Sequence, residues 1–300
     1  MATPRAGGPY NNGMAGMIDG LLLVFAVVAL AAPSLPRPAG AQKPAYPWLQ
    51  EHHGARDTIA RRFAPPRGFA RVAVRPGGFA AWLRHLPLKP AGAKVYLHDG
   101  RLKANQSAHA AVVDLDIGRR DLQQCADAVM RLRAEYLYSK RRYAAIAFNF
   151  TSGDRAAFSR WAEGWRPRIV GRKVSWTRRG ARGAGYASFR SYLVSVFTYA
   201  GSYSLARELK RVPRPGDIRI GDAFVQGGFP GHAVIVVDMA ADRASGRKAF
   251  LLAQSFMPAQ NLHVLKNPAR AGGSAWYTLP VGASLRTPEW TFALDHLRRF

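Results

Sequence analysis

Two continuous apolar runs joined by a short polar turn constrain the fold of this chain more than any other feature. The segment Gly221–Gln254 contains the runs His232–Met239 and Ala249–Ala253, which are rich in Val, Ile, Leu and Phe. Runs of this length and composition are typical of buried strands, and a Gly-containing turn between them predicts an antiparallel hairpin. The chain is therefore expected to fold around a sheet that has this hairpin at its centre.

A histidine stands where the first predicted strand begins. His232 follows the glycine-rich segment Gly227–Gly231 directly. A titratable imidazole beside a flexible loop is a candidate for acid–base chemistry, because its ordinary pKa lies close to neutral pH. The alternative interpretation is a structural histidine that caps the strand.

The register of the predicted hairpin selects a partner for this imidazole. If Met239 and Ala249 close the hairpin, Gln254 is the polar side chain closest to His232 across the ladder. Asp238 is acidic, but it lies on the same strand as His232, roughly 20 Å away at about 3.3 Å per residue. We therefore expect Gln254, and not Asp238, to orient the imidazole.

The only cysteine of the chain lies at the start of a predicted amphipathic helix. Asp121, followed three residues later by Gln124, matches a capping-box pattern, so Cys125 falls in the first turn. The positive end of a helix dipole favours a thiolate at such a position.

Elsewhere, Tyr186–Leu209 predicts a long helix interrupted by a glycine, and Trp290–Phe300 predicts a short amphipathic helix.

These residue types together form a candidate catalytic triad. Cys125 would be the nucleophile, His232 the base and Gln254 the residue that orients the imidazole. The backbone N–H of Cys125, with the side chain of Gln124 or Gln106, is a candidate oxyanion hole. The alternative is that Cys125 is a small buried residue on the apolar stripe of its helix.

The chain carries a large excess of positive charge. It has 44 Lys plus Arg residues against 18 Asp plus Glu, a formal net charge of +26. Such a positive field attracts polyanions. The alternative interpretation is that codon bias accounts for the arginines, which are then spread over the surface without a binding role. The densest basic segment, Arg166–Gly185, is expected to be a loop. Candidate residues there for binding an anionic polymer are Arg172, Lys173, Trp176, Arg178 and Arg179. No nucleic-acid motif is present, so nucleic acid is not an expected partner.

The first 41 residues predict export. The uncharged apolar run Gly20–Ala32 is too short to span a bilayer and precedes the small-residue pattern Ala39-Gly40-Ala41. Residues 1–41 are therefore expected to be a Sec-type signal peptide cleaved after about Ala41, and a retained anchor is the alternative. Residues 42–300 are expected to be a single periplasmic or secreted α+β domain with its core at about 110–300. It has no predicted membrane span, disulfide, metal or cofactor.

The order of these motifs resembles the papain-like superfamily, especially the exported cysteine amidases and endopeptidases of the bacterial cell wall. A helix-borne Cys125 is followed by Gly221-Asp222, then by Gly231-His232 opening an apolar strand, then by a polar residue on the next strand. The resemblance implies an α+β, papain-like core in which an antiparallel sheet packs on the Cys-bearing helix, with helical insertions. It also implies amide hydrolysis, with peptidoglycan or another anionic envelope polymer as partner. The Gln-Gln-Cys-Ala-Asp context departs from the usual Asp-Cys-Ser of these enzymes.

A second resemblance covers nearly the whole chain after the leader. The stretches LQQCADAVMRLRAEYLY, FPGHAVIVVDMA, FLLAQSFMPAQNLHVLKNP and TPEWTF resemble a bacterial family known as domain of unknown function 4846. That family brings no established activity. Two hypotheses therefore stand side by side: a cysteine hydrolase, and a non-catalytic envelope protein that binds anionic wall polymer.

Overall fold

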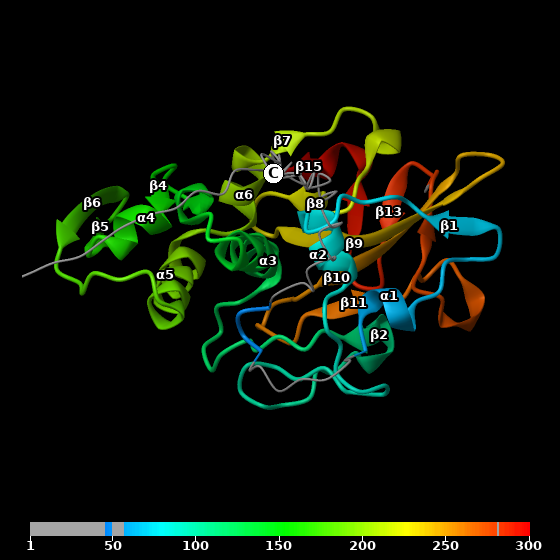
Figure 1. Cartoon of the computed structure of the whole chain (residues 1–300), viewed down its shortest axis with the longest axis horizontal. Coiled ribbons are helices and arrows are strands. Elements are labelled where there is room, and N and C mark those ends of the chain that lie inside the picture. The colour runs from blue at the N-terminus through cyan, green and yellow to red at the C-terminus, as the bar shows by residue number, and fades with distance from the viewer. Residues whose placement is uncertain (1–45, 50–56, 281) are drawn as a thin grey trace, which may run out of the picture. The chain divides into compact units, whose positions relative to one another are not determined.

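The predicted hairpin forms the two central strands of one antiparallel sheet (Figure 1). The computed structural model describes residues 46–49, 57–280 and 282–300. The strands of the sheet are β1 Phe69–Arg71, β2 His109–Val112, β7 Lys210–Arg211, β8 Ala223–Gln226, β9 His232–Asp242, β10 Lys248–Gln254, β11 His263–Leu265, β12 Tyr277–Thr278 and β15 Leu297–Arg299. Their order is β2-β11-β10-β9-β8-β15-β7, while β1 pairs with β9 and β12 pairs with β10.

The register of the central hairpin changes once along its length. Phe250 lies opposite Met239, whereas Ala253 lies opposite Ile235 after a shift between Leu251 and Leu252. One extra residue on β9 accounts for this shift, as in a β-bulge. Beyond the bulge the ladder runs in the predicted register, in which Gln254 follows Ala253 at the end of β10.

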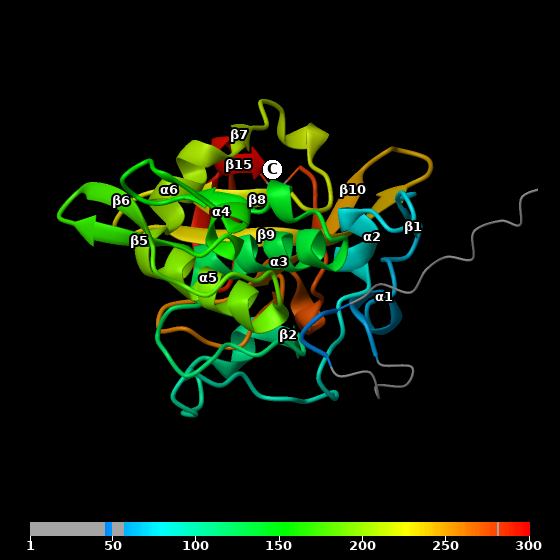
Figure 2. The same ribbon diagram turned by 60° about the vertical axis from the view of Figure 1, so that its left-hand side comes forward.

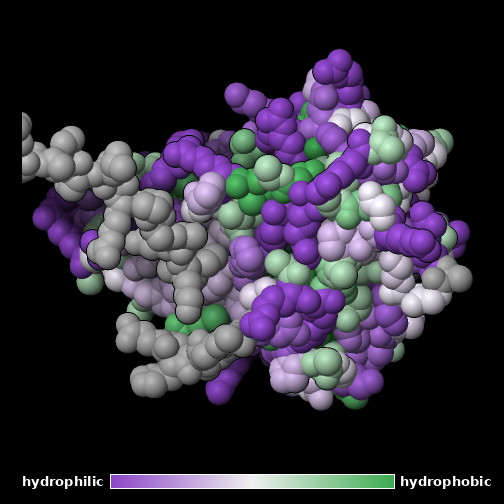
Figure 3. Space-filling view, turned by 45° about the vertical axis from the view of Figure 1, so that its right-hand side comes forward, coloured by the Kyte–Doolittle hydropathy of each residue, from purple (hydrophilic) through white to green (hydrophobic). Residues whose placement is uncertain are grey.

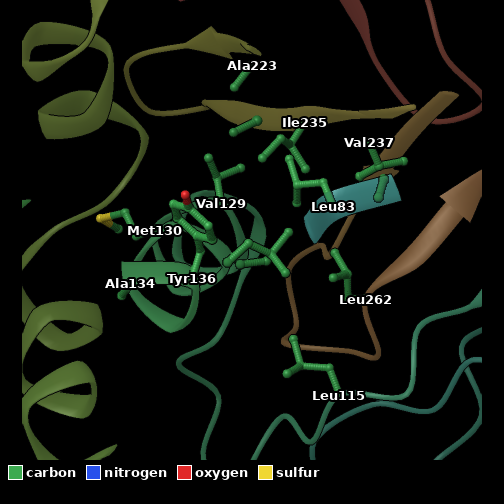
Figure 4. Packing of buried hydrophobic residues seen from close by; sticks show 14 of the residues in the cluster. Leu83, Leu115, Val129, Met130, Ala134, Tyr136, Ala223, Ile235, Val237 and Leu262 are labelled. Atoms are coloured by element: carbon green, nitrogen blue, oxygen red, sulfur yellow. The ribbon is translucent and has the colours of Figure 1, made fainter. Parts of the chain in front are cut away.

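Helices cover one face of the sheet. They are α2 (Phe79–Arg84) and α3 (Cys125–Ser139), while α5 (Tyr186–Tyr199) packs against α3. Val129 of α3 lies beneath Ile235 of β9 (Figure 4), and Met130 and Val237 belong to the same buried cluster. From Ala233 to Val237, the odd-numbered residues of β9 therefore face the helices, because side chains alternate along a strand; beyond the bulge the pattern reverses, and Met239 lies on the opposite face.

The opposite face is covered by a small hairpin formed by β13 (Ser284–Arg286) and β14 (Thr291–Ala293). Leu285 and Phe292 of this hairpin pack against Val234 and Val236 of β9 in a second buried cluster. His232 belongs to the even-numbered set, so its side chain shares this face. The α+β class expected from the sequence is thus confirmed, with a large antiparallel sheet between helices and a hairpin.

The segment between α3 and β8 adds further elements on one side of α3 (Figures 1 and 2). They are β3 Ala147–Asn149, β4 Arg155–Ala157, α4 Phe158–Ala162, β5 Trp165–Val170, β6 Lys173–Arg178 and α6 Ser202–Glu208. The expectation that residues 166–185 form a loop is wrong, because most of this segment forms the β5–β6 hairpin. The predicted C-terminal helix is also wrong: β14, a short 3₁₀ turn and β15 stand in its place.

The remaining helices are short: α1 Ile59–Arg62 and the 3₁₀ turns Gln106–Ala108, Tyr143–Ala145, Pro215–Asp217, Ala271–Gly273 and Leu294–His296. None of the helices in the described ranges is both long and apolar enough to cross a membrane. Hydrophilic residues predominate among the described residues on the face in Figure 3, with hydrophobic ones in smaller areas between them. The predicted signal peptide, residues 1–41, lies outside the described residues.

Candidate functional site

The cysteine is the first residue of α3. Gln124 is the N-cap, and its backbone N–H donates to Oδ2 of Asp127 at 3.1 Å, which closes the first turn. The prediction that Asp121 caps the helix is wrong. Its Oδ1 accepts instead from the Gln124 side chain at 3.0 Å and from the Ala259 N–H at 2.6 Å. The capping box thus lies three residues later than expected and starts the helix at Cys125.

The thiol lies against the backbone of β9. The N–H groups of Ala126 and Ala233 interact with the Cys125 sulfur and lower its pKa. Burial outweighs them and raises the pKa of the thiol to about 11, with a further contribution from Asp127. The thiol is therefore neutral at pH 7: the N–H groups at the helix start lower its pKa, as the sequence suggested, but burial outweighs them. Because Ala233 follows His232 directly, the sulfur lies beside the peptide unit that joins these two residues.

The imidazole of His232 is buried in an aromatic enclosure at the start of β9. Its ring centroid lies 4.6 Å from that of Phe256, 5.1 Å from that of Trp290 and 5.7 Å from that of Phe292. Burial lowers the pKa of His232 to about 4, although its hydrogen bond to Gln254 opposes the shift. The imidazole is therefore neutral at pH 7 and can accept a proton.

Gln254 contacts His232 and is held by two other side chains. The His232 Nε2 lies 2.8 Å from the Gln254 Oε1. The Gln254 Nε2 donates to Glu289 Oε2 at 2.8 Å and lies 3.4 Å from the Nε2 of His263. The Nδ1 of His263 lies 2.8 Å from the Asn261 carbonyl oxygen, which can only accept. His263 therefore carries its proton on Nδ1 and presents a lone pair to the Gln254 amide.

These contacts assign the tautomer of His232. Glu289 and His263 both require the NH₂ group of Gln254, so Oε1 must face His232. The Nε2 of His232 is then the donor, and its Nδ1 carries an unprotonated lone pair. Glu289 is fixed in turn by an ion pair with Lys103, whose side chain is 7% exposed. The network leaves Nδ1 as the basic atom of His232.

The cysteine and the histidine approach β9 differently. Cys125 packs with the buried cluster on the helix side of the sheet, which includes Ala233, whereas the imidazole lies on the sheet face that carries Phe292. Among the described residues, no hydrogen bond joins the Cys125 thiol to the His232 ring. The elements thus bring the two residues to the same end of β9 without placing them in direct contact.

The two predicted oxyanion side chains have different surroundings. Gln106 donates from Nε2 to the carbonyls of Val95 and Lys103, both at 2.8 Å, so it has no N–H left to offer. The prediction that it forms part of an oxyanion hole is therefore wrong. Gln124 donates one N–H to Asp121 and retains the other. Its position next to Cys125 keeps it a candidate.

The residues predicted to bind polymer lie on the β5–β6 hairpin: Arg172, Lys173, Trp176, Arg178 and Arg179. Trp176 is not free for a ligand, because its ring stacks on that of Phe150, with 6.4 Å between the ring centroids. The Arg160 guanidinium also lies over the Trp176 ring, 4.7 Å from its centroid. The Arg178 guanidinium lies over Trp165, 5.6 Å from its ring centroid. At the hairpin turn, Arg172 and Lys173 are exposed.

Sequence reasoning did not find Glu289, Lys103 or His263. Each lies far along the chain from His232 in a segment without a spacing rule that relates it to the hairpin. His263 was visible in the sequence as a histidine soon after the predicted hairpin, and Glu289 as an acid beside Trp290. In the part of the chain that the structure describes, no group of three or more His, Cys, Asp or Glu side chains could hold a metal ion.

The fold and site define an α+β protein with a helix-borne thiol and a buried imidazole–amide network at one end of its central sheet. The chain belongs to the family described as domain of unknown function (4846), whose model matches residues 59–299. No curated protein and no solved structure matches the chain.

Proposed function

We propose that this protein is an exported cysteine hydrolase of the papain-like type that cleaves amide bonds in cell-wall peptides. Cys125 is the nucleophile, His232 the base and Gln254 the residue that orients the base. One observation carries the proposal. The helix that begins at Cys125 packs against β9, so the thiol lies near the start of this strand, where His232 is held through Nε2 and Nδ1 is left to accept a proton. The motif order and the leader support the cell-wall assignment.

The chemistry uses a neutral thiol and a neutral imidazole. As the Cys125 sulfur attacks the amide carbonyl carbon, its proton passes to Nδ1 of His232, and the carbonyl oxygen takes the negative charge. This transfer requires the two side chains to move into contact when substrate binds, because no hydrogen bond joins them in the structure. Backbone N–H groups at the start of α3 and the free N–H of Gln124 are the donors for that oxygen. His232 then protonates the leaving amine as the C–N bond breaks, which leaves a thioester. Water, deprotonated by His232, releases the acid and restores the thiol.

Alkylation of Cys125 across pH tests this proposal. A thiol of pKa about 11 has a thiolate fraction of only ~10⁻⁴ at pH 7, so unassisted labelling rises about tenfold per pH unit. With His232 as base, we expect wild-type protein to react with iodoacetamide at least ~10-fold faster at pH 7 than His232→Gln. The wild-type rate is expected to change little from pH 6 to 8, because His232 deprotonates at about pH 4.

His296→Gln is the matched control, since this histidine lies in a 3₁₀ turn outside the network. It should label like the wild type. Equal rates for wild type and His232→Gln, both rising tenfold per pH unit, would instead make Cys125 a core residue. The non-catalytic polymer-binding protein would then be the better hypothesis.

The isosteric change Glu289→Gln is expected to make Nδ1 of His232 unable to accept a proton while leaving the His232 side chain in place. Lys103 would retain the oxygen of the new amide, so the NH₂ group of residue 289 would face the NH₂ group of Gln254. Gln254 relieves this conflict by rotating its amide, which presents an N–H to His232 Nε2. The proton then moves to Nδ1, and we expect labelling at pH 7 to fall ~10-fold or more.

The ring ¹⁵N chemical shifts of His232 provide a readout that a purely structural role would not change. They should report an Nε2–H tautomer in the wild type and an Nδ1–H tautomer in Glu289→Gln. A thermal melt of each variant checks that the network change does not unfold the protein. An unchanged tautomer together with a wild-type labelling rate would refute a positioning role for Glu289.

A further inference from the structure

A groove of about 510 Å³ lies beside the loop that leads into His232. Its walls come from the end of α5, the start of α6, the β5–β6 hairpin and the loop before β9. The lining residues are Phe150, Thr151, Ser152, Ile169, Gly171, Arg172, Val174, Tyr199, Tyr203, Gly228 and Phe229. Figure 2 shows β5 and β6 on the side of the molecule where α5 and α6 lie.

The groove gathers exposed aromatic rings. Phe229 is 89% exposed, Tyr199 40% and Tyr203 38%, and all three line the groove. Most large hydrophobic side chains of the described residues are buried, so this concentration on one surface is unusual. Exposed aromatic clusters in a concave site are typical of ligand-binding surfaces. Flat rings of this kind pack against the C–H faces of sugars.

The charge around the groove has one sign. Arg172 lines it, Lys173 is exposed beside it, and no Asp or Glu is among its lining residues. The Arg207 guanidinium lies 5.4 Å from the ring centroid of Tyr203, which places a second cation next to one of the lining residues. An occupant with carboxylates complements this surface, because guanidinium groups bind carboxylates through charge-assisted hydrogen bonds.

The groove is connected to His232 by a loop that is tightly packed. The Ser202 hydroxyl at the start of α6 donates to the Gly228 carbonyl at 3.3 Å. A Cβ at Gly231 would lie 2.2 Å from that hydroxyl oxygen and 2.5 Å from the Gly228 carbonyl oxygen, so only glycine fits there. Three residues separate Gly228 from His232, so the four steps along the chain span at most about 14 Å.

We infer that this groove binds the sugar end of a carboxylate-bearing sugar–peptide and directs its peptide towards Cys125. This inference rests on the proposed function, because it names the substrate class of the same site. An extended peptide covers about 3.3–3.6 Å per residue, so three or four stem residues span the distance from the groove to His232. The rings hold the sugars, and Arg172 holds a carboxylate.

Binding of a disaccharide–tetrapeptide from bacterial cell wall to the Cys125→Ala protein tests the inference by calorimetry. In that background, Arg172→Gln is expected to weaken binding ~10-fold and Phe229→Ala ~5- to 10-fold. Arg243→Gln and Leu102→Ala are the matched controls, because both residues are exposed and lie outside the groove. They should leave the dissociation constant unchanged. A probe with amidated carboxylates should bind ~10-fold more weakly and lose its dependence on Arg172.

An unchanged dissociation constant in Arg172→Gln and Phe229→Ala would overturn the inference, as would equal binding of the amidated probe. Cleavage of the same probe by the wild type is measured separately. Cleavage without a groove effect refutes the groove and leaves the hydrolase. A groove effect without cleavage supports the groove as a sugar–peptide site and removes the hydrolase.

Discussion

Replacement of Cys125 by serine is expected to abolish hydrolysis of cell-wall stem peptides, with a loss of roughly 10³- to 10⁶-fold. A hydroxyl is a much weaker acid than a thiol, and burial already raises the pKa of this position to about 11 for sulfur. The imidazole, with a pKa of about 4, is too weak a base to activate a serine in the same place. The measurement is release of new amino groups from a purified disaccharide–tetrapeptide.

The serine variant keeps the size of the side chain, so its fold is expected to be unchanged in a thermal melt. Cys125→Ala should be as inactive as the serine variant, because both lack the nucleophile. Met130→Leu in the same helix is a suitable control: it replaces a buried residue of α3 that lies in the core cluster. Retained hydrolysis in Cys125→Ser would show that the thiol takes no part in the reaction.

The central hairpin could be predicted because its signals are local. Continuous apolar runs and a Gly-containing turn determine β9 and β10, and the arithmetic of their register brings Gln254 next to His232. The bulge on β9, opposite Leu251 and Leu252, did not disturb this result, since the predicted pairing of Met239 with Ala249 gives the same register as the ladder beyond the bulge. Pairing across a ladder is thus accessible from sequence when the two strands are adjacent in the chain.

Other parts of the structure depend on contacts that sequence periodicity does not report. The β5–β6 hairpin is rich in arginine, yet its strands pair over six residues because arginine stems and aromatic rings pack on one another. Glu289 reaches Gln254 only through the folding of the hairpin β13–β14 against the sheet. The charge states also depend on burial, which raises the pKa of Cys125 where the helix terminus alone would lower it.

Substitution of Asp238 is expected to cause the largest loss of stability. The hairpin register ruled out this carboxylate as a partner of His232. Asp238 is fully buried, and its Oδ1 accepts from Arg84 Nε at 2.6 Å while its Oδ2 accepts from Arg71 Nε at 2.8 Å. It therefore ties α2 and β1 to the centre of β9. Removal of one partner from a buried ion pair leaves an uncompensated charge, which costs about 3–5 kcal/mol. We expect Asp238→Asn to lower the free energy of unfolding by this amount.

Urea denaturation measures this change, and an exposed ion pair provides the control. Arg211 and Asp295 lie 3.3 Å apart with side chains 61% and 57% exposed, so Asp295→Asn should cost only about 0–1 kcal/mol. Adding Arg84→Met to Asp238→Asn should recover part of the loss, because the buried cation that lacks its partner is then gone. A loss below about 1 kcal/mol in Asp238→Asn would mean that water or other groups solvate Arg84. The buried ion pair would then not be what holds α2 to the sheet.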